Sequence, residues 1–267
     1  NNTSSYLGMK KMKRTATAIA LALASSSAMA LPGLDLWAGG YTWNTAYEGG
    51  VNATSAGQPV ELSLDGTLGL EDSDNTVIWA AFEHPIPVIP NIQIKKTELE
   101  TSGTGAFTNS FSFGNETFTA SEALNSNISL NHTDITAYWG LPLPLVTIDF
   151  GLNVRKFDGE LAINSGISDL DAPIPMLFGR VGASLPFTGL EVMAEANYIG
   201  YKDTSHTDYQ VVLRYTLPVV PVLDINLEAG YRAFTLDIDP TDFDGDENDL
   251  AADIDMSGIF FGVSLHL

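Results

Sequence analysis

The stretch that decides the fold is "TLPVVPVLDINLEAGYRA", Thr216 to Ala233. Its first part holds two prolines among apolar residues and predicts a tight turn, because proline closes a turn without needing a partner for a backbone donor. Its second part alternates with a period of two, which is typical of a β-strand with one apolar and one polar face. One face carries Leu223, Ile225, Leu227, Ala229, Tyr231 and Ala233, and the other carries Asp224, Asn226, Glu228, Gly230 and Arg232.

The same alternation recurs along the chain, and no helical period is sustained anywhere. It predicts ten strands, at residues 34–48, 75–84, 92–102, 127–140, 146–158, 175–185, 190–202, 206–217, 223–238 and 252–267. The facing of the first three is ambiguous. In "LDLWAGGYTWN" the face with Leu34, Leu36 and Ala38 and the face with Trp37, Tyr41 and Trp43 are both apolar.

Two kinds of connection alternate between these strands. Apolar turns with proline occur in "EHPIPVIPNI" (83–92), "GLPLPLVTI" (140–148), "SLPFTGLEV" (184–192) and "TLPVVPVLD" (216–224). Most of the other junctions are long and acidic or rich in Gly, Ser and Asn; only the one at 203–205 is short. A soluble β-sandwich also alternates. Short turns at one end, long loops at the other and strands near the roughly 9–11 residues that cross a bilayer are instead typical of a membrane barrel. The predicted fold is therefore all-β, a single transmembrane antiparallel up-and-down β-barrel of about ten strands.

The segment "MKKMKRTATAIALALASSSAMA", residues 9–30, predicts a cleavable secretory signal peptide. It has a basic start, a short apolar run and the small-residue end Ala28-Met29-Ala30, which argue against a buried helix. Residues 1–8 are interpreted as an upstream extension, and residues 31–267 as the barrel. Together with an even number of strands, this leader predicts an outer-membrane location with both termini periplasmic. The proline turns would then be periplasmic and the acidic loops extracellular.

Charge and cysteine content exclude some classes of protein. The formal net charge is −21, and loss of Lys10, Lys11, Lys13 and Arg14 with the leader makes it four units more negative. Nucleic acid is therefore not an expected partner, because neutralising phosphates requires clustered Lys and Arg. There is no cysteine, which excludes a disulfide framework and thiolate chemistry.

The two ends of the predicted barrel, "LPGLDLWAGGYTWN" and "DIDMSGIFFGVSLHL", resemble a family of Gram-negative outer-membrane β-barrel proteins. Its members carry a Gly-Gly pair in the first strand, here Gly39-Gly40, and the family has no assigned biochemical function. The last strand also resembles the signal read by the barrel-assembly machinery, although it ends in Leu267 where Phe or Trp is usual. The resemblance implies that machinery, outer-membrane lipid and lipopolysaccharide as partners.

The arginines after residue 30 are Arg155, Arg180, Arg214 and Arg232. All four fall on the predicted lumen face, as expected because an arginine facing lipid at mid-bilayer costs about 2–4 kcal/mol. Counting residues from the turns places Arg180, Glu195, Arg214 and Glu228 at one height on adjacent strands, which predicts a belt of alternating charge. Asp149, Arg155, Glu191 and Arg232 are further predicted lumen residues. The belt either fills the lumen or lines a path for a small solute or ion.

The acidic stretch "DPTDFDGDENDLAADID", residues 239–255, resembles a calcium loop in part. Counted from Asp242, acids stand at positions 1, 3, 5 and 12, which are Asp242, Asp244, Asp246 and Asp253. The glycine stands at position 4, whereas an EF-hand loop requires it at position 6. A solvated loop and a weak Ca²⁺ site, bridging to lipopolysaccharide phosphates, are both open interpretations. No other cofactor is expected.

Evidence for catalysis is thin. A hydrolase needs a histidine beside an acid or a serine. His132 shares a strand face with Asp134, and His206 is expected in a short loop near Asp203 and Asp208, but neither arrangement forms a known motif. The sequence therefore predicts a non-catalytic outer-membrane barrel, either structural or a narrow solute or ion channel. The alternative is an outer-membrane hydrolase, a protease or lipid-modifying enzyme, with its site at the extracellular rim.

Overall fold

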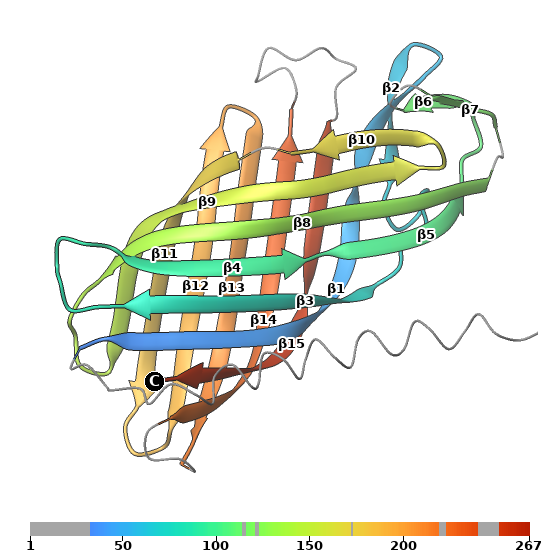
Figure 1. Ribbon diagram of the computed structural model, residues 1–267. Helices are drawn as coiled ribbons and strands as arrows, with labels where there is room; N and C mark the ends of the chain where they lie inside the picture. The colour runs from blue at the N-terminus through green and yellow to red at the C-terminus, as the bar shows by residue number, and fades with distance from the viewer. Residues whose placement is uncertain (1–32, 114–115, 121–122, 172, 219–222, 240–250) are drawn as a thin grey trace, which may run out of the picture. The chain divides into compact units, whose positions relative to one another are not determined.

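The computed structural model describes residues 33–113, 116–120, 123–171, 173–218, 223–239 and 251–267. Their regular structure is β throughout (Figure 1). Within these residues, no helix is long and apolar enough to span a membrane. The predicted signal peptide lies outside the described residues.

Ten antiparallel strands form a closed wall, as predicted. In order around the barrel they are β1 (Asp35–Ser55), β3 (Ser73–Glu83), β4 (Asn91–Glu98) continued by β5 (Glu100–Ala106), β8 (Ala123–Gly140), β9 (Val146–Ile163), β11 (Pro173–Leu185), β12 (Leu190–Tyr201), β13 (Thr204–Leu217), β14 (Asp224–Ile238) and β15 (Ala252–His266). β15 pairs with β1, from Trp37 opposite His266 to Val51 opposite Ala252, and so closes the ring.

The pair β4 and β5 forms one wall strand with an interruption at Leu99. The register against β8 continues across it, with Thr97 opposite His132 and Glu100 opposite Ser129. At the interruption the backbone N–H of Leu99 donates to Asn131 Oδ1 at 2.7 Å.

The four proline-containing segments connect β3 to β4, β8 to β9, β11 to β12 and β13 to β14. The described residues of these segments lie at the end of the barrel where β1 begins and β15 finishes, and where Leu36 N donates to Leu267 O (Figure 1). We call this the proline-turn end. The opposite end, the loop end, carries the strands β2 (Gln58–Ser63), β6 (Phe111–Phe113), β7 (Glu116–Phe118) and β10 (Gly166–Leu170). β6 and β7 pair as a short hairpin, with Phe111 opposite Phe118.

Apolar side chains cover the outside of the wall. Phe150, Leu152, Leu177 and Phe261 are 54%, 60%, 64% and 63% exposed. Soluble monomers rarely expose apolar surface continuously around the molecule, whereas an outer-membrane barrel presents such a band to lipid. Single exposed residues of this kind would need no explanation, but here they recur on wall strands all round the barrel.

The ambiguity of the first strands is resolved by the size of the side chains. Trp43 faces the lumen and is fully buried, whereas Leu36 faces outward and is 44% exposed. Large aromatic rings fill a narrow lumen, and the smaller aliphatic side chains of this strand face outward.

At the loop end, residues 62–70 lie along the edges of β1 and β5, where Leu64 N donates to Gly49 O and Leu70 pairs with Gly103, and their leucine side chains point into the lumen. We call these residues the plug segment. Leu62, Leu64 and Leu68 are fully buried within one apolar cluster of inward-facing wall residues. The cluster includes Val51, Leu99, Phe111, Ile128, Leu161, Leu236 and Ile254. The lumen at the loop end is therefore packed with side chains.

Two glycines of β5 hold the plug segment against the wall. Leu70 forms a β-bridge with Gly103. A Cβ atom on Gly103 would overlap the carbonyl oxygen of Gly69, and one on Gly105 would overlap that of Thr67. Only glycine leaves room for two backbones to approach so closely.

Candidate functional site

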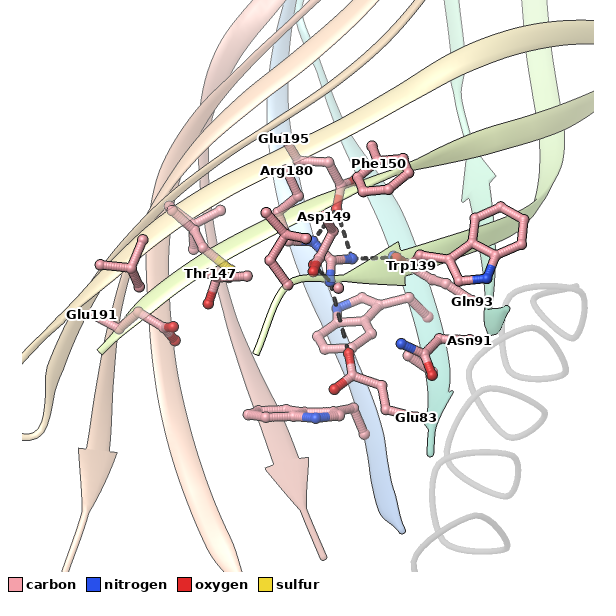
Figure 2. Close-up of a pocket in the computed structure, with 18 of the residues that line it drawn as sticks. Glu83, Asn91, Gln93, Trp139, Thr147, Asp149, Phe150, Arg180, Glu191 and Glu195 are labelled. Carbon is pink, nitrogen blue, oxygen red and sulfur yellow. Dashed lines mark hydrogen bonds and ion pairs between the residues drawn. The ribbon is translucent and has the colours of Figure 1, made fainter. Parts of the chain in front are cut away.

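The lumen is hollow at the proline-turn end, where a cavity of about 710 Å³ lies between the wall strands (Figure 2). We call it the chamber. Its rim includes residues of the β3–β4 and β8–β9 turns, and its walls carry inward-facing side chains of β3, β4, β9 and β11–β14. Its charged residues are Glu83, Lys95, Asp149, Arg180, Glu191, Glu195, Arg214 and Glu228.

Arg180 organises the first group of charges in the chamber. Its guanidinium donates to Asp149 Oδ2 at 3.2 Å, to Glu195 Oε2 at 3.1 Å and to Gln93 Oε1 at 2.5 Å (Figure 2). Lys95 Nζ donates to the other oxygen of Glu195, also at 2.5 Å. Glu195 is thus held by two cations, as a buried carboxylate must be to offset its desolvation.

Arg214 organises a second group. It donates to Glu191 Oε2 at 2.8 Å and to Glu228 Oε1 at 2.9 Å, and its guanidinium lies 4.8 Å from the ring of Trp37. Ser264 Oγ donates to the same oxygen of Glu228 at 2.7 Å.

The predicted single belt is therefore wrong in one respect, because Arg214 does not pair with Glu195. In the register of β12 and β13, Glu195 lies opposite Gln210, and Arg214 lies opposite Glu191. The cause is the hairpin turn, which closes at Lys202-Asp203 with Tyr201 opposite Thr204. The count from the turns took β13 to begin later and so displaced the register by four residues. The pairs Arg180–Glu195 and Arg214–Glu228 do form.

Above the chamber, toward the loop end, two buried arginines share two carboxylates. Arg155 makes a two-pronged contact with Asp134, at 2.7 and 2.8 Å, and donates to Asp208 at 2.5 Å. Arg232 makes a second two-pronged contact with Asp208, at 2.9 and 2.7 Å. Two positive and two negative charges are balanced here. We call these four residues with His132 and His206 the arginine network.

The hydrogen bonds of the two histidines fix their protonation. Nδ1 of His132 lies 2.8 Å from the carbonyl oxygen of Leu130, and Nδ1 of His206 lies 2.7 Å from that of Thr235. A carbonyl oxygen only accepts, so each Nδ1 carries the proton. Nε2 of His206 faces Arg155 at 2.7 Å, and Nε2 of His132 faces Arg232 at 3.5 Å. A guanidinium only donates, so each Nε2 accepts and both rings are neutral.

His206 lies within β13 and is 1% exposed, so the expectation that it occupies a loop is wrong. The strand begins two residues earlier than its alternation indicated. Its alternation continues through His206, whose side chain points into the lumen.

The donor atoms of His132, Asp134 and Asp208 lie within 4.8 Å of one another, which is a spacing that a metal ion could use. The same oxygens already accept hydrogen bonds from Arg155 and Arg232. Because two guanidinium groups bind these ligands, the donor set does not fit a metal site.

The predicted calcium ligands fall mostly outside the described residues, which exclude Asp242, Asp244 and Asp246. The fourth, Asp253, lies on β15 opposite Asp237 and beyond the apolar band. With Glu61, Asp203 and Asp239, the two line a hollow of about 290 Å³. Partial burial and the neighbouring carboxylate of Asp237 raise the pKa of Asp253. Calcium binding stays a prediction.

No family model matches the sequence, and no curated protein matches it. Among solved structures, the outer membrane protease OmpT from Escherichia coli is 12% identical, with a TM-score of 0.42 over 87% of this chain and 96% of that one. The translocator domain of the autotransporter NalP from Neisseria meningitidis is 14% identical, with a TM-score of 0.35 over 96% and 95%. A Pseudomonas aeruginosa FadL homologue is 8% identical, with a TM-score of 0.30 over 88% and 90%. None of these similarities carries an activity over to this chain.

The closed ten-stranded wall, the apolar exterior and the charged interior define an outer-membrane type of β-barrel. Membership of the family with the Gly-Gly pair stays a prediction.

Proposed function

We propose that this chain is a non-catalytic, integral outer-membrane β-barrel with a closed lumen, a structural membrane protein rather than a channel. The observation that carries the proposal is the plug segment, in which Leu62, Leu64 and Leu68 are fully buried inside the loop end of the barrel. Both termini and the proline turns are periplasmic in this proposal, so the chamber opens to the periplasm. Outer-membrane lipid, lipopolysaccharide and the assembly machinery are its partners.

Two blocks in series support a closed lumen. The arginine network spans the middle of the barrel with Arg155 and Arg232 at 0% and 1% exposure. The apolar cluster around the plug segment follows it toward the loop end. An aqueous channel needs a continuous wetted path, and neither Arg155 nor Arg232 lines the chamber, which ends before the arginine network.

The histidines support the absence of catalysis. A general base must offer a free lone pair to a substrate proton. The Nε2 lone pair of His206 accepts a hydrogen bond from Arg155, and that of His132 faces Arg232. Both rings are buried deep in the lumen. This is the reason for preferring a structural role over a hydrolase.

Conductance across a planar lipid bilayer tests the proposal. The refolded protein is expected to insert without producing conductance steps. A variant in which a short Gly-Ser linker replaces residues 64–70 lacks most of the plug segment, and any residual block then comes from the arginine network. Conductance steps from the wild-type protein, of the size expected for a small solute path, would contradict a closed lumen.

Labelling of intact cells tests the orientation. A peptide tag inserted at Asn109 at the loop end is expected to be accessible, and one at Phe187 in the β11–β12 turn is expected to be hidden. Phe187 is fully exposed, so burial within the protein could not hide it. Surface labelling at Phe187 would reverse the orientation.

A further inference from the structure

We infer that the chamber is a binding site for a small organic cation, an amine or guanidinium group on an apolar body, that enters from the proline-turn end. The inference rests on the proposed orientation only for the side of the membrane from which the ligand comes. The volume of the chamber, about 710 Å³, lies within the roughly 300–1,000 Å³ of small-molecule sites.

The charge of the chamber is the first argument. Five carboxylates line it against three cations, Lys95, Arg180 and Arg214. The deep carboxylates are closely neutralised, since Glu195 contacts Lys95 and Arg180, and Glu228 contacts Arg214. The two negative charges in excess therefore belong to the outer part of the chamber, where Glu83, Asp149 and Glu191 share Arg180 and Arg214 with the deeper pairs.

The second argument is the unused bonding capacity of these outer carboxylates. Glu83 Oε1 accepts from Tyr138 at 2.6 Å, and its distance to Arg180 is 3.9 Å. Asp149 uses Oδ2 for Arg180 at 3.2 Å. In the described part of the chain, Glu83 Oε2 and Asp149 Oδ1 have no hydrogen-bond donor. Figure 2 shows Glu83, Asp149 and Arg180 converging on one part of the chamber.

Exposure separates two of the outer carboxylates from the two deep ones. The side chains of Glu83 and Glu191 are 31% and 19% exposed, whereas those of Glu195 and Glu228 are 8% and 4% exposed. Glu83, which has a spare oxygen, is therefore the carboxylate that a ligand meets first, whereas the side chain of Asp149 is 8% exposed.

The third argument is aromatic and involves the Gly-Gly pair. The indole of Trp79 lines the chamber and lies flat enough against β1 that a Cβ on Gly39 would be 2.8 Å from Trp79 Cε2. Gly39 thus leaves Trp79 room to lie back against the wall, which widens the chamber. An aromatic face beside carboxylates binds organic cations through the ring quadrupole. The rim adds apolar surface from Ile86, Ile89, Leu141 and Leu143 for the body of the ligand.

Calorimetric titration of the refolded protein in a non-ionic detergent tests the inference. Three probes of equal length are compared: 1,8-diaminooctane, the neutral 1,8-octanediol and the dianion suberate. The diamine is expected to bind at least tenfold more tightly than either of the others, and Trp79 fluorescence is expected to change on binding. Equal binding of the diol or suberate, or no binding of the diamine, would overturn the inference.

Matched variants locate the site. Glu83→Gln with Glu191→Gln is expected to weaken diamine binding at least tenfold, and both side chains are exposed enough to be replaced without loss of folding. Glu98→Gln is the control, because Glu98 is 58% exposed and pairs with Lys96 outside the chamber. Unchanged binding in the double variant would place the diamine elsewhere and overturn the assignment. Gly39→Ala, which pushes Trp79 into the chamber, is expected to weaken binding without altering the charge.

The two proposals fail separately. A wild-type protein that conducts ions but prefers the diamine overturns only the closed lumen. A non-conducting protein that does not discriminate among the three probes overturns only the cation site.

Discussion

The two halves of the lumen differ in how far side chains fill the space inside the barrel. Near the proline-turn end the interior is hollow, and its ion pairs border a cavity. Near the loop end the interior is filled, first by the arginine network and then by leucines and aromatic rings. The same alternating strands build both halves, so the difference comes from what the inward positions carry and from the plug segment.

The comparison teaches where charge is structural and where it is available. Arg155 is 0% exposed and pairs with Asp134 of β8 and Asp208 of β13, so its ion pairs hold the wall together. Arg214 is 9% exposed and borders the chamber, where water and a ligand can compete for its carboxylates. Breaking equivalent interactions in the two halves should therefore have unequal effects.

The largest effect is expected for Arg155→Met. It leaves Asp134 buried without its cation and deprives Asp208 and His206 of a donor. Removing one member of a buried ion pair costs about 3–5 kcal/mol. Urea unfolding of the protein in lipid vesicles measures the loss. A change below about 1 kcal/mol would mean that water reaches the network and would remove one of the two blocks in the lumen.

Gly103→Val is expected to have the next largest effect, because its side chain would overlap the carbonyl oxygen of Gly69. Overpacking of this kind costs about 1–3 kcal/mol, and it displaces the plug segment from β5. Unfolding and bilayer conductance are measured together. The control is Gly179→Val, since no atom lies within 4 Å of a Cβ at Gly179. Equal losses in the two variants would show that the plug does not depend on Gly103.

Arg214→Met is the counterpart of Arg155→Met in the open half. Water in the chamber can solvate Glu191, so the expected loss of unfolding free energy is about 1 kcal/mol, the upper end for exposed pairs. The same urea titration checks it. A loss as large as that of Arg155→Met would show that the chamber is dry and would abolish the contrast between the two halves.

The smallest effect concerns the loop end outside the membrane band. The pKa of Asp253 is raised by partial burial and by Asp237, so its charged form is disfavoured in the folded protein. The ionised side chain of Asp253 therefore lowers the stability of the folded protein at neutral pH. This loss disappears as the pH falls toward 3.8, the ordinary pKa of an aspartate, because the side chain is then protonated. Asp253→Asn is expected to stabilise the folded protein at pH 7 by no more than about 0.5 kcal/mol, which a small rise in melting temperature would show. Near pH 4 the melting temperature is expected to stay unchanged. A gain of equal size at both pH values would contradict the assigned cause.

The alternation of side chains predicted the wall strands well, because the period of two is imposed by the pleat of every strand. It predicted the inward side of all four arginines for the same reason. It could not decide the facing of β1, where Leu36 and Trp37 are both apolar and only the width of the lumen distinguishes them. The pairing of Glu195 was missed because strand register depends on where a hairpin closes, and the two-residue turn at Lys202-Asp203 is not marked by glycine or proline.

The sequence did not predict the chamber or the plug segment, and the reason is different. Lys95 belongs to a strand of ambiguous facing, so its pairing with Glu195 was not predicted. Leu62, Leu64, Leu68 and Leu70 lie between two predicted strands, in a stretch that reads as an extracellular loop. Their spacing was an available signal, since four leucines in nine residues are too apolar for a solvated loop. Only the glycines of β5 show where these leucines pack.

The seam between β1 and β15 also has a kinetic consequence. Every other neighbouring pair of wall strands is joined by a connection that is short compared with the chain, whereas Trp37 and His266 come from its opposite ends. Closing that loop has the greatest entropic barrier, and contacts of large sequence separation form slowly. The leucines of the plug segment must already point inward when the seam forms, because afterwards no edge is left open. The order of the strands along the chain therefore determines that the seam between β1 and β15 closes last during assembly.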